Sequence, residues 1–103
     1  MADRYAVTII KQGRSGTIRY REGLFHRHEF YWEYGGSEQV VMLIRVPSPA
    51  EWPHDVRWAA DRRDEVLTRV AREVAREGCP GCGFSLGDVW LHILAPASAA
   101  PAP

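Results

Sequence analysis

The two cysteines of the chain, Cys79 and Cys82, are the residues whose types and spacing most directly suggest chemistry. They lie in the stretch EGCPGCGF at 77–84, and a Cys-x-x-Cys pair is used both by redox enzymes and by zinc sites. In thioredoxin-like redox proteins such a pair opens a helix, whose N-terminus lowers the pKa of the first thiol. Here the pair follows Gly78, the expected end of a helix, where the helix dipole disfavours a thiolate. The sequence therefore favours a turn that carries two thiols over a redox centre.

A structural zinc site needs four ligands, and this turn supplies two. The candidate metal ligands are three histidines and the two cysteines, namely His26, His28, His54, Cys79 and Cys82. The topology expected below places the histidines at one end of the fold and the cysteines at the other. Zinc would then be bound at the histidine end, or by cysteine pairs shared between two copies of the chain.

Other catalytic motifs are missing from the sequence, which contains neither a G-x-S-x-G nucleophile motif nor a glycine-rich phosphate loop before a helix. Glu51 and Asp55 are expected near the histidine end and would allow acid–base chemistry there. The sequence leans against an enzyme. Metal binding or catalysis, at the histidine end or at the Cys79/Cys82 pair, is the alternative to a binding function.

Composition narrows the possible partners. The 13 basic and 13 acidic residues cancel, so no net charge attracts the chain to nucleic acid or to an anionic membrane. Four arginines share one expected sheet face with aromatic residues, but Glu29 and Glu33 lie on the same face. Cross-strand charge pairing on a solvated surface explains this face better than nucleic-acid binding.

With 103 residues, the chain is expected to form one α+β domain over 1–94. Residues 95–103 contain only Ala, Pro and Ser and are predicted to be a disordered tail. No early apolar run is long enough for a signal-peptide core or a membrane span. We therefore expect a cytoplasmic protein, in which the two thiols would stay reduced.

Alternating or continuous apolar residues predict five strands, at 5–11, 17–21, 24–34, 38–46 and 88–94. Matching the faces across each hairpin favours a connection at 21–23 with Gly23 left-handed. The same test favours a loop at 35–37, which sets Trp32 opposite Val40. The inner face would then carry Ile18, Tyr20, Leu24, Phe30, Trp32, Val40, Met42, Ile44 and Val46.

The segment between the fourth and fifth strands predicts a helix that covers the sheet. Ser48 and Glu51 have the spacing of a reciprocal cap, and Pro53 would begin the main helix, which Gly78 ends. Such a helix would return the chain so that the fifth strand pairs with the first. The predicted fold is therefore a five-stranded antiparallel sheet, in the order 5-1-2-3-4, with one long helix on its inner face.

Apolar side chains expected on the surface provide the main functional signal. Tyr31, Val41 and Leu43 should lie on the outer face near Phe25, and the fourth strand should be an edge. Trp58 falls on the side of the helix away from the sheet, unless the preceding segment folds back over it. We therefore predict a non-catalytic interaction module without a cofactor, whose partner is another protein or a second copy. The partner-binding candidates are Trp58, Tyr31, Val41, Leu43 and Phe25.

Overall fold

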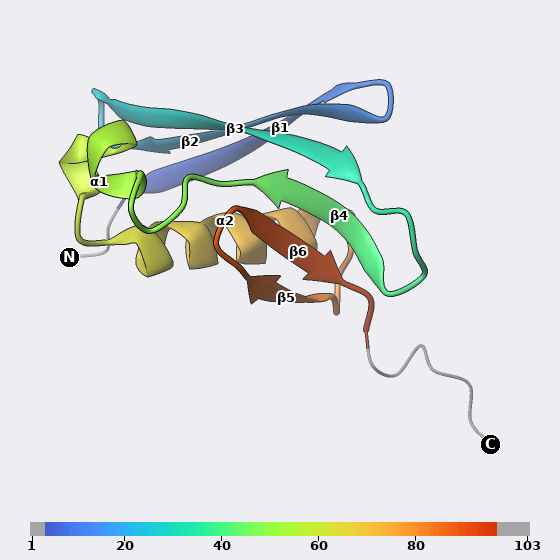
Figure 1. Cartoon of the computed structure of the whole chain (residues 1–103). Helices are drawn as coiled ribbons and strands as arrows, with labels where there is room; N and C mark the ends of the chain where they lie inside the picture. Colours follow the sequence, from blue (N-terminus) through green and yellow to red (C-terminus); the bar gives the residue numbers. More distant parts are fainter. Residues whose placement is uncertain (1–3, 97–103) are drawn as a thin grey trace.

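The computed structural model describes residues 4–96, which form one curved sheet with helices against one side (Figure 1). The elements, in chain order, are β1 (Tyr5–Gln12), β2 (Ser15–Glu22), β3 (His26–Tyr34), β4 (Val40–Arg45), α1 (Trp52–Asp55), the 3-10 helix η1 (Arg57–Ala59), α2 (Arg63–Gly78), β5 (Gly83–Leu86) and β6 (Trp90–Leu94). Most of the predicted tail, 97–103, lies outside the described residues. Ala95, the first residue of the predicted tail, is held against the sheet, since its N–H donates to the Gln39 carbonyl at 2.9 Å.

The sheet is antiparallel throughout, with six strands in the order β1-β2-β3-β4-β6-β5. The predicted α+β class with one main helix is thus confirmed, whereas the five-strand count and the order 5-1-2-3-4 are wrong. The edges of the sheet are β1 and β5, so β4, which we expected at an edge, is an inner strand between β3 and β6.

The error in topology comes from one missed hairpin. The stretch GFSLGDVWLHIL at 83–94 contains two strands joined by a turn, and the Gly87 N–H closes that turn onto the Trp90 carbonyl at 2.9 Å. This added reversal makes β6 antiparallel to β4, so the two strands pair directly. Phe84 and Leu86 alternate with small residues before a Gly-Asp turn, which is the sequence signal that indicates β5.

The β2–β3 connection contains the predicted left-handed glycine, since Gly23 has φ +62°. The tight connection lies two residues later than expected, because Glu22 still pairs with His26. Leu24 therefore stands in the turn, 81% exposed, and not on the inner face where we placed it. The displacement is an even number of residues, so Ile18 and Phe30 still share the buried face.

The β3–β4 register differs from the prediction by four residues, because Trp32 lies opposite Ile44 and not opposite Val40. The loop after Tyr34 is longer than we expected. The Gly35 N–H donates to the Val41 carbonyl, and a register shift between Val40 and Met42 leaves Val41 without a partner in β6. A shift of four preserves the alternation of faces, so Met42 and Ile44 are buried as predicted, whereas Val40 is half-exposed.

The predicted long helix is broken into α1, η1 and α2. The reciprocal cap is present, since Glu51 N–H donates to Ser48 Oγ and Ser48 N–H donates to Glu51 Oε1, both at 3.2 Å. Val56, with φ −127° and ψ 67°, then interrupts the helix. The buried Trp52 indole donates to the Ala59 carbonyl at 2.7 Å, which fixes the fold-back.

One face of α2 supplies the second layer of the core. Its buried residues recur at helical spacing and are Val66, Leu67, Val70, Ala71, Val74 and Ala75. They pack against the inner side chains of the sheet, and α2 contacts both edge strands, β1 and β5. Within residues 4–96, no helix packs on the opposite face of the sheet (Figure 1).

Gly16 is the position where the core tolerates no side chain. The Trp32 indole lies against Gly16 of β2 and donates to the Ile10 carbonyl of β1 at 3.2 Å. A Cβ on Gly16 would lie 1.9 Å from the Ile10 oxygen and 2.9 Å from Trp32 Nε1. The glycine therefore makes room for this hydrogen bond.

We expect Gly16→Ala to lower the free energy of unfolding by about 2 kcal/mol or more, because backbone and indole must both move. Urea denaturation followed by tryptophan fluorescence measures the change. Gly83→Ala is the matched control, since a Cβ on this strand glycine meets nothing within 4 Å. Equal stability of the two variants would contradict the role assigned to Gly16.

Candidate functional site: the outer face of the sheet

The face of the sheet opposite α2, called the outer face here, carries the side chains that alternate with the buried ones. Its central part crosses five strands, and the register places Ile10 opposite Thr17, Thr17 opposite Tyr31, Leu43 opposite His92 and Arg45 opposite Trp90. Tyr31 is 48% exposed, while Leu43 and Trp90 are half-buried. Apolar and aromatic groups thus run across the middle of a face on which the described part of the chain places no second layer.

The polar atoms of the outer face hold these aromatic groups in place. The Tyr31 hydroxyl donates to Glu33 at 2.9 Å, and this hydrogen bond raises the pKa of the phenol. The Arg45 guanidinium lies 5.5 Å from the centre of the Trp90 ring, which is a cation–π distance. Arg19 and Glu29 form an exposed cross-strand ion pair at 2.9 Å.

The structure brings some of the predicted partner-binding residues together and separates others. Tyr31 and Leu43 lie on the outer face, as expected. Phe25 stands at the β2–β3 turn and is 86% exposed. Val41 is half-buried against the core. Trp90 and His92 were not among our candidates, because the β4–β6 pairing that places them on this face depends on the missed hairpin.

Trp58 lies on the helix side of the molecule and takes part in a stack of four rings. Its indole is 5.0 Å from the His26 ring and 6.2 Å from the Tyr20 ring, with planes within 3° of parallel. Tyr5 continues the stack at 5.9 Å from Tyr20. Trp58 is half-buried, because η1 folds back over the end of the sheet.

A charged cluster next to this stack joins β2 to α2. Glu22 accepts hydrogen bonds from the Tyr20 hydroxyl at 2.6 Å, from Arg69 at 2.9 Å and from Arg62. Burial opposes ionisation of Glu22, but the hydrogen bonds from Arg62 and Tyr20 and the two guanidinium charges outweigh it and lower the pKa of the carboxyl. Burial and the bond to Glu22 raise the pKa of Tyr20, which stays a neutral donor.

The histidine end is partly assembled. His28, Glu51 and Asp55 line one shallow depression of about 330 Å³. Burial lowers the pKa of His28, although the charges of Asp55 and Glu29 oppose the shift. His26 is stacked on Trp58, and His54 is exposed. Within residues 4–96, no group of three His, Cys, Asp or Glu side chains is placed to hold a metal ion.

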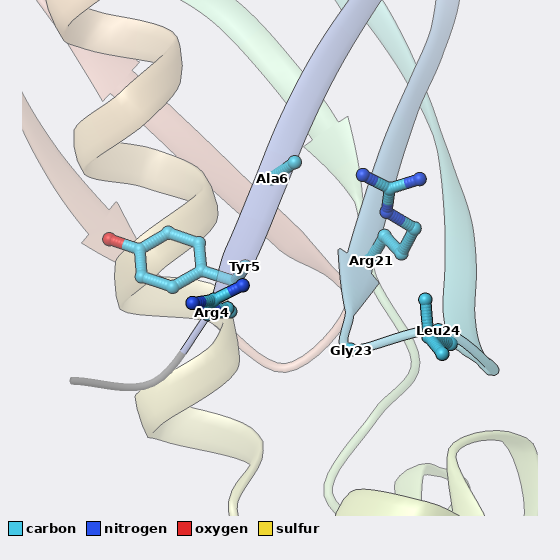
Figure 2. Close-up of a pocket in the computed structure, with 6 residues that line it drawn as sticks. All are labelled: Arg4, Tyr5, Ala6, Arg21, Gly23 and Leu24. Carbon is cyan, nitrogen blue, oxygen red and sulfur yellow. The ribbon is translucent and has the colours of Figure 1, made fainter. Parts of the chain in front are cut away.

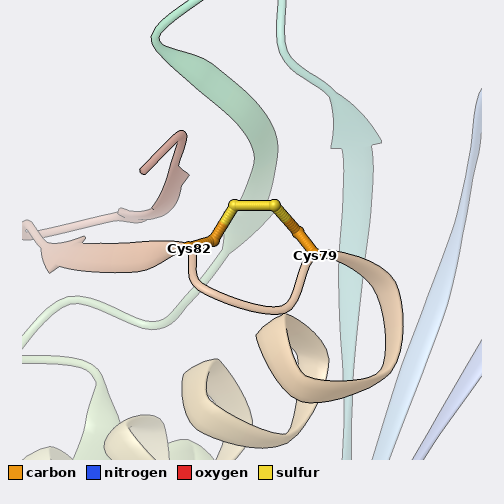
Figure 3. The surroundings of a disulfide bond; sticks show 2 residues. All are labelled: Cys79 and Cys82. Carbon is orange, nitrogen blue, oxygen red and sulfur yellow. A yellow bond between two sulfur atoms is a disulfide. The ribbon is translucent and has the colours of Figure 1, made fainter. Parts of the chain in front are cut away.

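The cysteines form a disulfide across the turn between α2 and β5, contrary to our expectation that they stay reduced (Figure 3). Their Cα atoms are 5.5 Å apart, because the turn brings them together. Closing a loop of four residues stabilises a fold by about 2 kcal/mol in the chain-entropy model, against nearly 5 kcal/mol for a loop of about a hundred residues. This disulfide therefore stabilises the fold less than one that joins distant segments.

A further depression of about 420 Å³ lies where β1 begins beside the β2–β3 turn (Figure 2). The Gly23 N–H donates to the Arg4 carbonyl at 3.2 Å and joins its two sides. Tyr5 extends toward α2 in Figure 2, while Ala6 and Arg21 belong to the outer face. The depression is thus open at the end of the sheet and is not an enclosed ligand cavity.

Comparison with known proteins does not assign this arrangement. No family model matches the chain, and searches of curated proteins and of solved structures found no match. Over the described part of the chain, no helix has the length and apolar character needed to cross a membrane.

The Glu22 cluster generates a prediction about pH and stability. The Glu22 pKa is depressed in the fold, so its contribution is present above the unfolded value of about 4.5 and is lost as the pH falls through the folded value. We expect Glu22→Gln to cost about 2 kcal/mol at pH 7 and progressively less below pH 4.5.

Urea denaturation of both proteins between pH 7 and pH 3 measures this difference. Glu29→Gln is the control, because its ion pair with Arg19 is about half exposed and should contribute a few tenths of a kcal/mol. A Glu22→Gln deficit that does not shrink in acid would contradict the electrostatic explanation.

Proposed function

We propose that this protein is an interaction module that forms a homodimer through the outer face of its sheet. The observation that carries the proposal is the run of apolar and aromatic side chains across a sheet face that residues 4–96 leave uncovered. When one face of an antiparallel sheet packs on the core, the side chains on the solvent-facing side are ordinarily polar. Here Tyr31, Leu43 and Trp90 occupy the middle of it.

The size of the outer face fits a second copy of the chain. Six strands span five spacings of about 4.8 Å, and strands of four to nine residues are roughly 13–30 Å long, so the face projects an area of roughly 550 Å². Side-chain relief makes the accessible area larger than this projection. A standard protein interface buries about 800 Å² on each partner. Two such faces packed as a sandwich would reach that size.

The charges of the outer face also favour self-association. Arg21 and Arg27 lie directly opposite each other, and neither forms an ion pair with a carboxylate in residues 4–96. Glu33, on the same face, is hydrogen-bonded by Tyr31 and has no arginine partner among the described residues. The face thus carries both a repulsive basic pair and an available acidic group. In a two-fold symmetric dimer, Glu33 of each copy could pair with Arg21 or Arg27 of the other copy.

The dimer explains why Tyr31 and Leu43 need not be covered within one chain, and it gives Arg45 and Trp90 a role at an interface. Aromatic and arginine side chains are enriched among residues that dominate binding energy. Trp58 has no part in this contact, because the stack with Tyr20 and His26 already engages its ring.

Sedimentation equilibrium of the full chain between about 1 and 200 µM tests the proposal. We expect a dimer, and we expect Tyr31→Glu and Leu43→Glu each to weaken it at least tenfold, because each places a charge in the apolar centre. Tyr31 is half exposed, so its variant should fold as the wild type does.

Arg57→Glu is the matched control, since Arg57 is exposed on η1, away from the outer face. A monomer over the whole concentration range would overturn the proposal. A dimer that persists in both outer-face variants would also overturn it.

A further inference from the structure

The Cys79–Cys82 disulfide lies in a turn that has backbone hydrogen bonds of its own. The turn is held by its backbone, because the Cys82 N–H donates to the Cys79 carbonyl at 2.9 Å and the Cys79 N–H donates to the Ala75 carbonyl at 2.7 Å. Pro80 and Gly81, with φ +93° at the glycine, fit the two central positions of a type II turn. Both sulfur atoms therefore stay close together when the bond between them is broken.

One of the two cysteines lines a surface depression of about 450 Å³ with a basic and partly aromatic wall. The depression lies beside the end of α2, and its lining residues include Cys82, Phe84, Arg72 and Arg76, whereas Cys79 is not among them. None of its described lining residues is a carboxylate, although Glu73 and Glu77 lie beside Arg76. Cys82 is thus the cysteine that this depression reaches.

The arginines give this depression a positive character. Arg72 is exposed and forms no ion pair within the described residues. Arg76 is hydrogen-bonded to Glu73 but leaves 69% of its side chain exposed. A disulfide compound that carries carboxylates would find both a charged partner and an apolar surface here.

The two thiols of the reduced form would differ in acidity. Cys79 is the C-cap of α2, where the negative end of the helix dipole opposes a thiolate. Cys82 lines the same depression as Arg72 and Arg76, and arginines near a thiol favour its thiolate. This asymmetry assigns a nucleophilic role to Cys82 and a resolving role to Cys79.

We infer that this turn is a thiol–disulfide exchange site for anionic disulfides, and that the structure holds its oxidised form. In the reduced protein, the Cys82 thiolate attacks a substrate disulfide, forms a mixed disulfide and releases one substrate thiolate, which takes up a proton. The Cys79 thiol then loses its proton and attacks Cys82 Sγ, which releases the second substrate thiol and forms the Cys79–Cys82 bond. The substrate gains two electrons and two protons, the protein loses them, and a dithiol of another molecule restores the reduced state.

The site is independent of the proposed dimer, since it lies on the turn between α2 and β5 and uses no residue of the outer face. Its activity is therefore expected in the Tyr31→Glu variant as well.

The test uses the reduced full-length chain and two disulfide probes, anionic oxidised glutathione and neutral hydroxyethyl disulfide. Samples are quenched with an alkylating agent, and intact masses give the rates. We expect Cys79→Ser to accumulate a mixed disulfide with one glutathione on Cys82, and Cys82→Ser to react at least tenfold more slowly.

Removing the positive charges separates recognition from general thiol reactivity. We expect the double variant Arg72→Ala/Arg76→Ala to react about fivefold more slowly with oxidised glutathione and at the wild-type rate with hydroxyethyl disulfide. Arg57→Ala, which removes an exposed arginine elsewhere, should change neither rate.

Circular dichroism confirms that each variant is folded before its rates are compared. A mixed disulfide that accumulates on Cys79 as fast as on Cys82 would overturn the assignment of roles. Equal slowing with both probes, or no slowing with either, would overturn the anionic substrate class.

Discussion

The packing of α2 against a single face of the sheet is the constraint on which the rest of the structure depends. Its apolar stripe, from Val66 to Ala75, buries the inner side chains of a sheet that is wider than the helix. Because α2 contacts both β1 and β5, the sheet curves around it (Figure 1). One helix can satisfy one face in this way, and the other face must be polar, paired or covered by a partner.

At the end of the sheet near η1, the chain covers its own apolar side chains. There the helical segment turns back, Trp52 is buried, and Trp58 stacks on His26 and Tyr20. The neighbouring Glu22 cluster joins the same end to α2 through Arg62 and Arg69. The middle of the outer face has no such cover in the described structure, which is why its apolar groups call for an intermolecular explanation and Trp58 does not.

Much of the inner face could be predicted from sequence, because the alternation of side chains survives errors that shift a strand by an even number of residues. The β2–β3 turn moved by two positions and the β3–β4 register by four, yet Phe30, Trp32 and Ile44 are buried as expected. Strand order had no such protection. Because the chain reversal at Gly87 was not recognised, the last strand was predicted beside β1, whereas it lies beside β4.

The same reversal determined how much of the candidate sites the sequence could reveal. Tyr31 and Leu43 follow from local alternation, whereas Trp90 and His92 join them only once β6 pairs with β4. Trp58 could not be placed by helical periodicity, because Val56 breaks the helix on which that periodicity relied. The prediction that the Cys-x-x-Cys pair follows the end of a helix was correct.

That prediction considered the helix dipole and not the side chains that the fold brings near the second cysteine. Arg76 and Arg72 lie about one and two turns before Cys79 along α2, yet they share a surface depression with Cys82 because the turn folds beside the end of the helix. In the proposed exchange site the dipole acts on Cys79 and the arginines act on Cys82, so the two influences do not cancel. Inequality between paired thiols is what directed exchange requires, and a turn that only ended the helix would have no use for it.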